Sequence, residues 1–214
     1  FDDLRAAATL PIDGVVLPKV DDSDRLHHNL DTLNNAAERE IPVWVMTETA
    51  RGVLEADRLY GASPQITGVI LGTSDLSREL RIPHTPDRAG FIHLLDHCVI
   101  AARAHGMDII DGVHLNFRDL DEFALHCEQG RTLGFDGKSL IHPQQIPACN
   151  AAFSPEDKAI SEAREIVAAW DRAQQAGQGV CVVNDRLIEN LHVEEAQRTL
   201  ALATALAQRG DAET

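Results

Sequence analysis

Two short apolar segments of this chain end abruptly in polar residues and an acid. The first lies in residues 42–52 (PVWVMTETARG), where the apolar run gives way to Glu48 and its flanking threonines. The second lies in residues 68–76 (GVILGTSDL), where a similar run is followed by a polar turn and Asp75. Continuous apolar runs, unlike alternating ones, are typical of parallel strands that are covered on both faces. We therefore expect an α/β fold with both segments as buried strands.

The two acids follow these strands at equivalent places. Ligands of parallel α/β sheets bind at the carboxyl ends of the strands, so Glu48 and Asp75 are expected at one edge of the sheet. Two neighbouring carboxylates repel each other unless a hard divalent cation lies between them. We therefore predict that Glu48 and Asp75 bind Mg²⁺. In the alternative interpretation, each carboxylate caps the helix that follows it or pairs with Arg51 or Arg78.

Strand and helix patterns alternate along the first part of the chain. Apolar segments starting near residues 14, 43, 69, 109 and 135 predict five strands, with helices expected at 24–38, 50–60, 91–104 and 119–130. Such alternation predicts a parallel sheet, and a TIM (β/α)8 barrel needs eight such units. Because the chain begins within a helical pattern, we expect three strand–helix units to precede residue 1. An open sheet of five strands is the alternative.

The pattern changes after residue 150. Residues 154–157 (SPED) have the composition of a helix start, with Ser154 as the N-cap and proline at the first helical position. This helix is expected to reach about residue 176, where Gly177 and Gly179 end it. A short strand-like segment at 180–188 and a final helix at 193–209 follow. We therefore expect residues 1–150 to form the barrel part and residues 151–214 a C-terminal helical extension.

Composition limits the partners of the chain. The formal net charge of −15 disfavours nucleic acids, because proteins bind the phosphate backbone largely through lysine and arginine. The four cysteines are widely spaced, without a CxxC pair, which suits a reducing compartment. No apolar run approaches the roughly 20 residues that a transmembrane helix requires. We expect a cytoplasmic protein with neither a nucleic-acid nor a membrane partner.

The histidines give a weaker indication of a metal site. His93, His97 and His126 lie on expected helices and belong to no HExxH pattern, so we expect them on the surface or in the core. His114 and His142 follow expected strands, close enough to the mouth of the barrel to contact a ligand.

Four segments of the chain resemble the HpcH/HpaI aldolase/citrate lyase family, and most closely its citrate lyase beta-subunit-like branch. They are ETARG at 48–52, LGTSDL at 71–76, DGVHLNFRD at 111–119 and GFDGKSLIHPQQI at 134–146. The resemblance implies a TIM barrel with a C-terminal helical extension, Mg²⁺ bound by Glu48 and Asp75, and a homotrimer or a hexamer made of two trimers. It also implies cleavage or formation of a carbon–carbon bond in a hydroxyacyl-CoA thioester.

The resemblance points to further site residues. The GFDGKSLIHPQQI segment is expected to contact the acyl-CoA through Lys138, Ser139, His142 and Pro143. An exposed, purely structural Lys138 is the alternative. Glu189, in VVNDRLIENLHV, matches the acid that a neighbouring subunit contributes in relatives, and we expect it to transfer a proton at the acetyl carbon. Relatives more usually carry aspartate at this position, and often at that of Asn116.

These features predict a magnesium-dependent carbon–carbon lyase. Its expected substrates are short hydroxydicarboxylyl-CoA or citryl thioesters such as (3S)-malyl-CoA and citramalyl-CoA. Three alternatives stay open: a hydrolase of the malyl-CoA thioester, a CoA-independent aldolase that forms pyruvate, and a non-catalytic subunit that binds a carrier protein.

Overall fold

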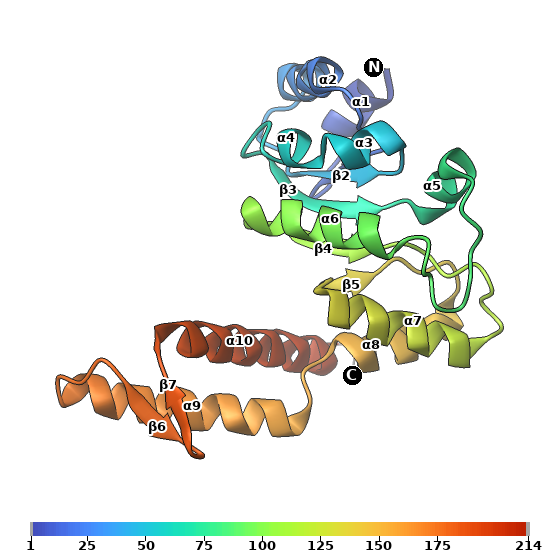
Figure 1. Ribbon diagram of the computed structural model, residues 1–214. Helices are drawn as coiled ribbons and strands as arrows, with labels where there is room; N and C mark the ends of the chain where they lie inside the picture. Colours follow the sequence, from blue (N-terminus) through green and yellow to red (C-terminus); the bar gives the residue numbers. More distant parts are fainter. Residues whose placement is uncertain (1, 213–214) are drawn as a thin grey trace. The chain divides into compact units, whose positions relative to one another are not determined.

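The computed structural model describes residues 2–212 and divides into two compact units, Phe1–Phe153 and Ser154–Thr214. The first unit is a parallel sheet with helices, and the second consists of two helices and a β-hairpin (Figure 1). The division lies close to the boundary expected at residue 150. A role of the second unit in an oligomer or in a neighbouring active site stays a prediction.

Five parallel strands form the sheet of the first unit, in the order β1-β2-β3-β4-β5. They are β1 (Val15–Leu17), β2 (Val43–Thr47), β3 (Ile66–Leu71), β4 (Asp108–Asp111) and β5 (Gly137–Lys138). Each strand pairs with the strand that follows it in the chain; Val45 lies opposite Val69, for example. The predicted parallel α/β fold is confirmed. Within the described residues the sheet is open, so closure into an eight-stranded barrel stays a prediction.

The helices of the first unit are α1 (Asp2–Ala8), α2 (Ser23–Ala36), α3 (Ala50–Leu54), α4 (Ala56–Tyr60), α5 (Thr73–Leu80), α6 (Ile92–Ala104), α7 (Leu120–Leu133), the 3₁₀ helix η1 (Pro143–Gln145) and α8 (Ile146–Phe153). The helix expected at 50–60 is divided in two at Glu55. Helix α5 was not predicted, because only a polar turn was expected after β3. It packs through the buried Leu76 and ends at Arg81, which has a left-handed backbone conformation. Asp75 therefore lies in a helix instead of directly at a strand end.

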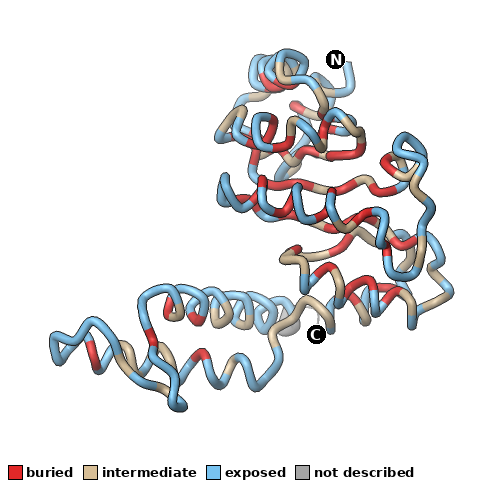
Figure 2. Tube along the Cα trace, in the orientation of Figure 1, coloured by how far each residue is buried: buried red, intermediate tan, exposed pale blue. Residues whose placement is uncertain are grey.

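The apolar core of the first unit lies between the sheet and helices α2, α4 and α6. Its strand side includes Val43, Val45 and Val69, all fully buried. Figure 2 shows the buried positions concentrated along the strands and on the inner sides of the helices. The buried Tyr60 joins this core with its hydroxyl 2.8 Å from Oγ1 of Thr47, so its one polar atom is satisfied.

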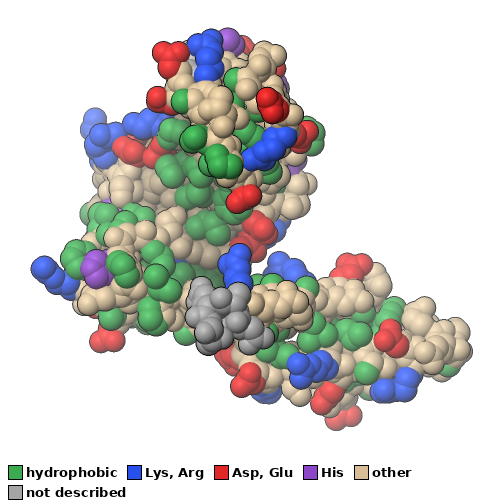
Figure 3. All heavy atoms as spheres, turned by 180° about the vertical axis from the view of Figure 1, so that it is seen from behind, with side chains coloured by type: hydrophobic (Ala, Val, Ile, Leu, Met, Phe, Trp, Pro, Cys, Tyr) green, Lys and Arg blue, Asp and Glu red, His purple; other side chains and the backbone are tan. Residues whose placement is uncertain are grey.

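The opposite face of the sheet is apolar but only partly buried. Trp44, Met46, Ile70 and Ile110 are half-buried, and Val16 is 47% exposed. Figure 3 shows hydrophobic side chains gathered on one face of the first unit. Both faces were expected to be covered, yet the described residues cover only one. The apolar runs thus correspond to a sheet with one buried face and a second face that is apolar and half-buried.

The second unit contains α9 (Asp157–Gln175), β6 (Cys181–Val183), β7 (Arg186–Ile188) and α10 (Asn190–Ala212). The expected N-cap at Ser154 is wrong, because Glu156 is still extended and is the residue that precedes the helix. The strand-like segment is an antiparallel hairpin, whose Asn184 and Asp185 both have positive φ, as tight hairpin turns require. Within residues 2–212, no helix has both the length and the apolar character needed to cross a bilayer.

Candidate metal and substrate site

Glu48 immediately follows β2 and is buried, with 6% of its surface exposed. Its Oε1 accepts a hydrogen bond of 2.9 Å from the backbone N–H of Lys19. Its side chain lies against Gly72, the residue after β3, so closely that a Cβ on Gly72 would come within 2.4 Å of the Glu48 Cβ. The carboxylate thus lies at the carboxyl end of β2, as expected, and also contacts the segments that follow β1 and β3, which was not predicted.

Asp75 lies in the first turn of α5, where the helix dipole favours an acid. Its Oδ1 accepts a hydrogen bond of 2.6 Å from Arg78, whose side chain is 76% exposed. The ion pair with Arg78 was the alternative to a metal ligand, and it is present in the structure. Such an exposed pair stabilises a protein by at most about 1 kcal/mol, so Arg78 is a weak competitor for a bound cation.

The electrostatics of Glu48 suit a cation. Burial raises the pKa of Glu48 above its ordinary value, and the nearby Asp75 carboxylate raises the pKa further, against the N–H of Lys19. Both effects penalise the negative charge, and a divalent cation would remove the penalty. The donors are carboxylate oxygens, which Mg²⁺ prefers. The alternative roles of Glu48 were to cap the following helix or to pair with Arg51. In the structure Thr49 caps α3, and Arg51 pairs with Glu55.

The predicted acyl-CoA contacts lie at the end of β5 and in the segment after it. Lys138 is buried, so the alternative of an exposed lysine is wrong; its Nζ donates to Asp111 at 2.7 Å and to the Gly112 carbonyl at 2.6 Å. Ser139 and His142 are half-buried, and Pro143 is exposed. His142 caps η1 and stacks on Phe117, with the ring centres 4.7 Å apart. The structure leaves the predicted CoA contacts of these residues untested.

A buried ion network at the ends of β4 and β5 was not predicted. Asp111, which is fully buried, accepts hydrogen bonds from Nη1 of Arg88 at 2.9 and 2.7 Å and from Nζ of Lys138 at 2.7 Å. Burial lowers the pKa of Lys138, and the Asp111 carboxylate opposes this effect. Arg88 belongs to a polar turn far from Asp111 in sequence, so only the folded chain brings them together.

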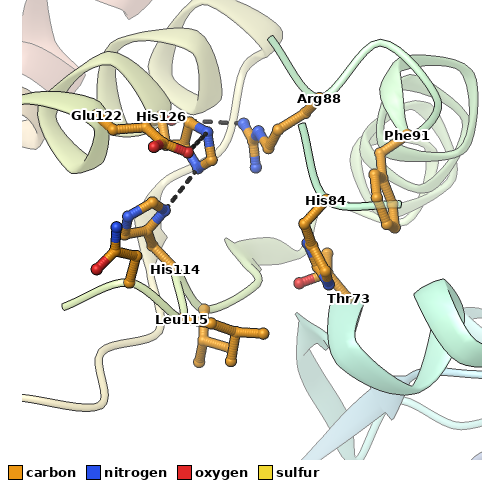
Figure 4. Close-up of a pocket in the computed structure, with 10 residues that line it drawn as sticks. Thr73, His84, Arg88, Phe91, His114, Leu115, Glu122 and His126 are labelled. Carbon is orange, nitrogen blue, oxygen red and sulfur yellow. Dashed lines mark hydrogen bonds and ion pairs between the residues drawn. The ribbon is translucent and has the colours of Figure 1, made fainter. Parts of the chain in front are cut away.

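Two histidines and an acid lie beside this network (Figure 4). Nδ1 of His114 lies 3.1 Å from Nδ1 of His126, and Nε2 of His126 lies 3.7 Å from Oε1 of Glu122. Both histidines are buried; burial lowers the pKa of His114 and, together with Arg88 and Lys138, lowers that of His126 to about 4. His126 was expected in the core or on the surface without a partner, so this pairing corrects the prediction. The spacing of Glu122 and His126, one helical turn apart, was the available signal.

The cluster borders a cavity of about 180 Å³. Its lining comes from α5, the segment before α6, the segment after β4, and α7, and includes Thr73, His84, Arg88, His114 and Asn116. Figure 4 shows Thr73, His84 and Phe91 across the cavity from the two paired histidines. Because Thr73 and Asp75 belong to the same turn of α5, the cavity and the predicted magnesium site lie at neighbouring strand ends.

Glu189 lies in the second unit, between β7 and α10, and is exposed. Its backbone N–H donates to Nδ1 of His192 at 3.1 Å. The carboxylate is therefore accessible to another molecule. Its action in a neighbouring active site stays a prediction.

Sequence comparisons identify relatives with named activities. A model of the HpcH/HpaI aldolase/citrate lyase family matches residues 1–143. The chain is 43% identical over 205 residues to a (3S)-malyl-CoA thioesterase of Cereibacter sphaeroides strain KD131, covering 96% of this chain and 70% of the relative. It is 33% identical to citrate lyase subunit beta of Leuconostoc mesenteroides subsp. cremoris, covering 95% and 69%. It is 30% identical to an L-malyl-CoA/beta-methylmalyl-CoA lyase of Cereibacter sphaeroides, covering 91% and 68%.

Solved structures share the fold. A citrate lyase from Burkholderia xenovorans matches with a TM-score of 0.80 at 24% identity, covering 96% of this chain and 69% of that one. The CitE protein of Mycobacterium tuberculosis, in complex with magnesium, acetoacetate and coenzyme A, matches with a TM-score of 0.69 at 26% identity, covering 95% and 73%. Since the family model spans most of the first unit and relatives match nearly the whole chain, the chain belongs to the HpcH/HpaI aldolase/citrate lyase family.

Proposed function

We propose that this chain forms part of a magnesium-dependent enzyme that acts on the CoA thioester of a short hydroxydicarboxylic acid. The observation that carries the proposal is the buried Glu48 carboxylate at the carboxyl end of β2, whose pKa is raised by burial and by the neighbouring Asp75 in the first turn of α5. A magnesium-bound relative supports the choice of cation. When bound by Glu48 and Asp75, Mg²⁺ would attract substrate oxygens and stabilise negative charge that develops on them.

Two reactions of such a thioester fit this site. In hydrolysis, water replaces the thiolate at the thioester carbon, and malyl-CoA gives malate and free CoA. In carbon–carbon cleavage, malyl-CoA gives glyoxylate and acetyl-CoA, and no thiol is released. The relative at 43% identity is named a thioesterase, whereas the lyases match at 33% and 30%. We therefore place hydrolysis of (3S)-malyl-CoA first, ahead of the lyase activity expected from the sequence alone.

Products distinguish the candidates. The protein is incubated with (3S)-malyl-CoA and Mg²⁺, and free thiol and glyoxylate are measured in parallel. Thiol without glyoxylate identifies the hydrolase, and glyoxylate without thiol identifies the lyase. If malyl-CoA, citramalyl-CoA and citryl thioesters all stay intact, the proposal of an enzyme fails and a carrier-binding subunit takes its place.

Mutations of Glu48 and Asp75 test the metal site directly. We expect Glu48→Gln and Asp75→Asn to lose Mg²⁺ binding in calorimetry, because each removes one charged oxygen ligand, while the fold measured by circular dichroism is kept. Glu40→Gln is the matched control, since Glu40 is an exposed acid on the segment that leads into β2. Undiminished Mg²⁺ binding in both site variants would disprove the assignment.

A further inference from the structure

The cluster of His114, Glu122 and His126 has no role in the proposed reaction, yet the three side chains offer ligand atoms that all lie within 4.8 Å of one another. Two imidazole nitrogens and one carboxylate oxygen differ in kind from the all-oxygen pair of Glu48 and Asp75. Nitrogen ligands favour borderline cations of the zinc type, whereas carboxylates alone favour magnesium. The ligand atoms of this cluster therefore favour a different ion from the one proposed for Glu48 and Asp75.

Hydrogen bonds determine which nitrogens are available. Nε2 of His126 lies 3.0 Å from the carbonyl oxygen of Pro86, which can only accept, so this nitrogen carries the proton. Nδ1 of His126 therefore carries no proton, and its lone pair is directed at Nδ1 of His114. A metal-binding histidine commonly donates its other N–H to a backbone carbonyl in this way. His126 is thus already in the tautomer that a metal ligand needs.

The spacing of the two rings also fits a metal ion. Two nitrogens bound at about 2.05 Å to one tetrahedral Zn²⁺ lie about 3.3 Å apart. The two Nδ1 atoms of His114 and His126 are separated by 3.1 Å. Without metal, His114 holds its proton on Nδ1 and donates it to the bare Nδ1 of His126.

From this geometry we propose that His114, Glu122 and His126 form a second metal site, for a divalent cation of the Zn²⁺ class. Binding moves the His114 proton from Nδ1 to Nε2, so that both Nδ1 lone pairs face the ion and no proton is gained or lost. Three protein ligands leave a fourth position open, and the adjoining cavity of about 180 Å³ can supply water or a small ligand there.

Cobalt is a suitable probe, because Co²⁺ occupies zinc sites and absorbs visible light when its coordination is tetrahedral. The metal-free protein is titrated with Co²⁺ in the presence of excess Mg²⁺, which occupies oxygen sites. We expect tetrahedral absorption bands that reach their maximum at one Co²⁺ per chain and are abolished by Zn²⁺. Absence of these bands would overturn the proposal.

Variants identify the ligands. Glu122→Gln keeps the size of a half-buried side chain and should weaken Co²⁺ binding at least about tenfold, and His114→Gln and His126→Gln should abolish the bands. The matched control is the double variant His93→Gln and His97→Gln, which removes an exposed histidine pair one turn apart on α6. Bands that disappear only in this control would assign the ion to the surface of α6. Circular dichroism checks the fold, and Glu122→Gln decides the outcome if the histidine variants unfold.

Discussion

At Gly72 the absence of a side chain shapes the predicted magnesium site. The backbone φ of Gly72 is −99°, so glycine is not needed there for its conformational freedom. It is needed for space, because a Cβ would lie 2.4 Å from the Cβ of Glu48 and 2.8 Å from its Oε2. The glycine therefore determines where the Glu48 carboxylate can lie.

We expect Gly72→Ala to weaken Mg²⁺ binding by about 10- to 100-fold, because the added methyl group displaces a ligand that it does not replace. Calorimetric titration with Mg²⁺ measures the effect. Gly179→Ala is the control, since a Cβ there meets nothing within 4 Å. Unchanged affinity in Gly72→Ala would show that the Glu48 side chain adjusts or binds no metal.

The elements of the sheet could largely be predicted from the sequence. Continuous apolar runs located the five strands, because burial in a parallel sheet leaves a pattern within each short segment. Helix α5 was missed, and residues 180–188 were expected as one strand-like segment instead of a hairpin, since these structures depend on contacts that a local pattern does not contain. The same reason explains why only part of the site could be predicted from the sequence. Glu48 could be predicted from its place after a strand, whereas Arg88, Asp111 and Lys138 form a network across distant segments.

That network joins β4, β5 and the segment before α6. We expect Asp111→Asn to lower the free energy of unfolding by about 3–5 kcal/mol, because it leaves the buried Arg88 and Lys138 without their counter-charge. Urea denaturation measures this difference. Asp108→Asn makes the same chemical change at an exposed position of the same strand and should alter stability by less than about 0.5 kcal/mol. Equal effects in the two variants would contradict a structural role for the network.

On the scale of the whole molecule, the half-buried sheet face is the main unexplained surface. We expect the 214-residue chain to bind the dye ANS on this face, because Trp44 and its apolar neighbours are partly exposed there. The sequence has two tryptophans, so Trp44 alone remains in the Trp170→Phe variant. Bound ANS should quench the fluorescence of Trp44. The reciprocal variant Trp44→Phe keeps Trp170 of the second unit and should lose less fluorescence. Equal quenching in both would place the dye elsewhere.

Glu189 gives a prediction about assembly. If it serves a neighbouring subunit, two inactive variants can restore each other: Glu48→Gln lacks the metal ligand, and Glu189→Ala lacks the proton-transfer group. After an equal mixture is refolded, about a quarter of the interfaces combine an intact Glu48 with an intact Glu189 and regain activity. Native mass spectrometry confirms that subunits have exchanged. Mixed activity no higher than that of the parents would place Glu189 in its own subunit or outside the site.

The strand order has a consequence for how this unit folds during synthesis. Among residues 2–212, each strand of the first unit pairs with the strand before or after it in the chain, so each pairing closes a loop of one intervening segment. Parallel pairs are slow to form, because the chain entropy of the connecting loop is lost before the strands make contact, but pairing consecutive strands keeps each loop as short as a parallel sheet allows. As the chain leaves the ribosome, each new strand can be added to the edge of the strand that emerged before it. The sheet can therefore grow in one direction, from β1 to β5, without waiting for the last residues.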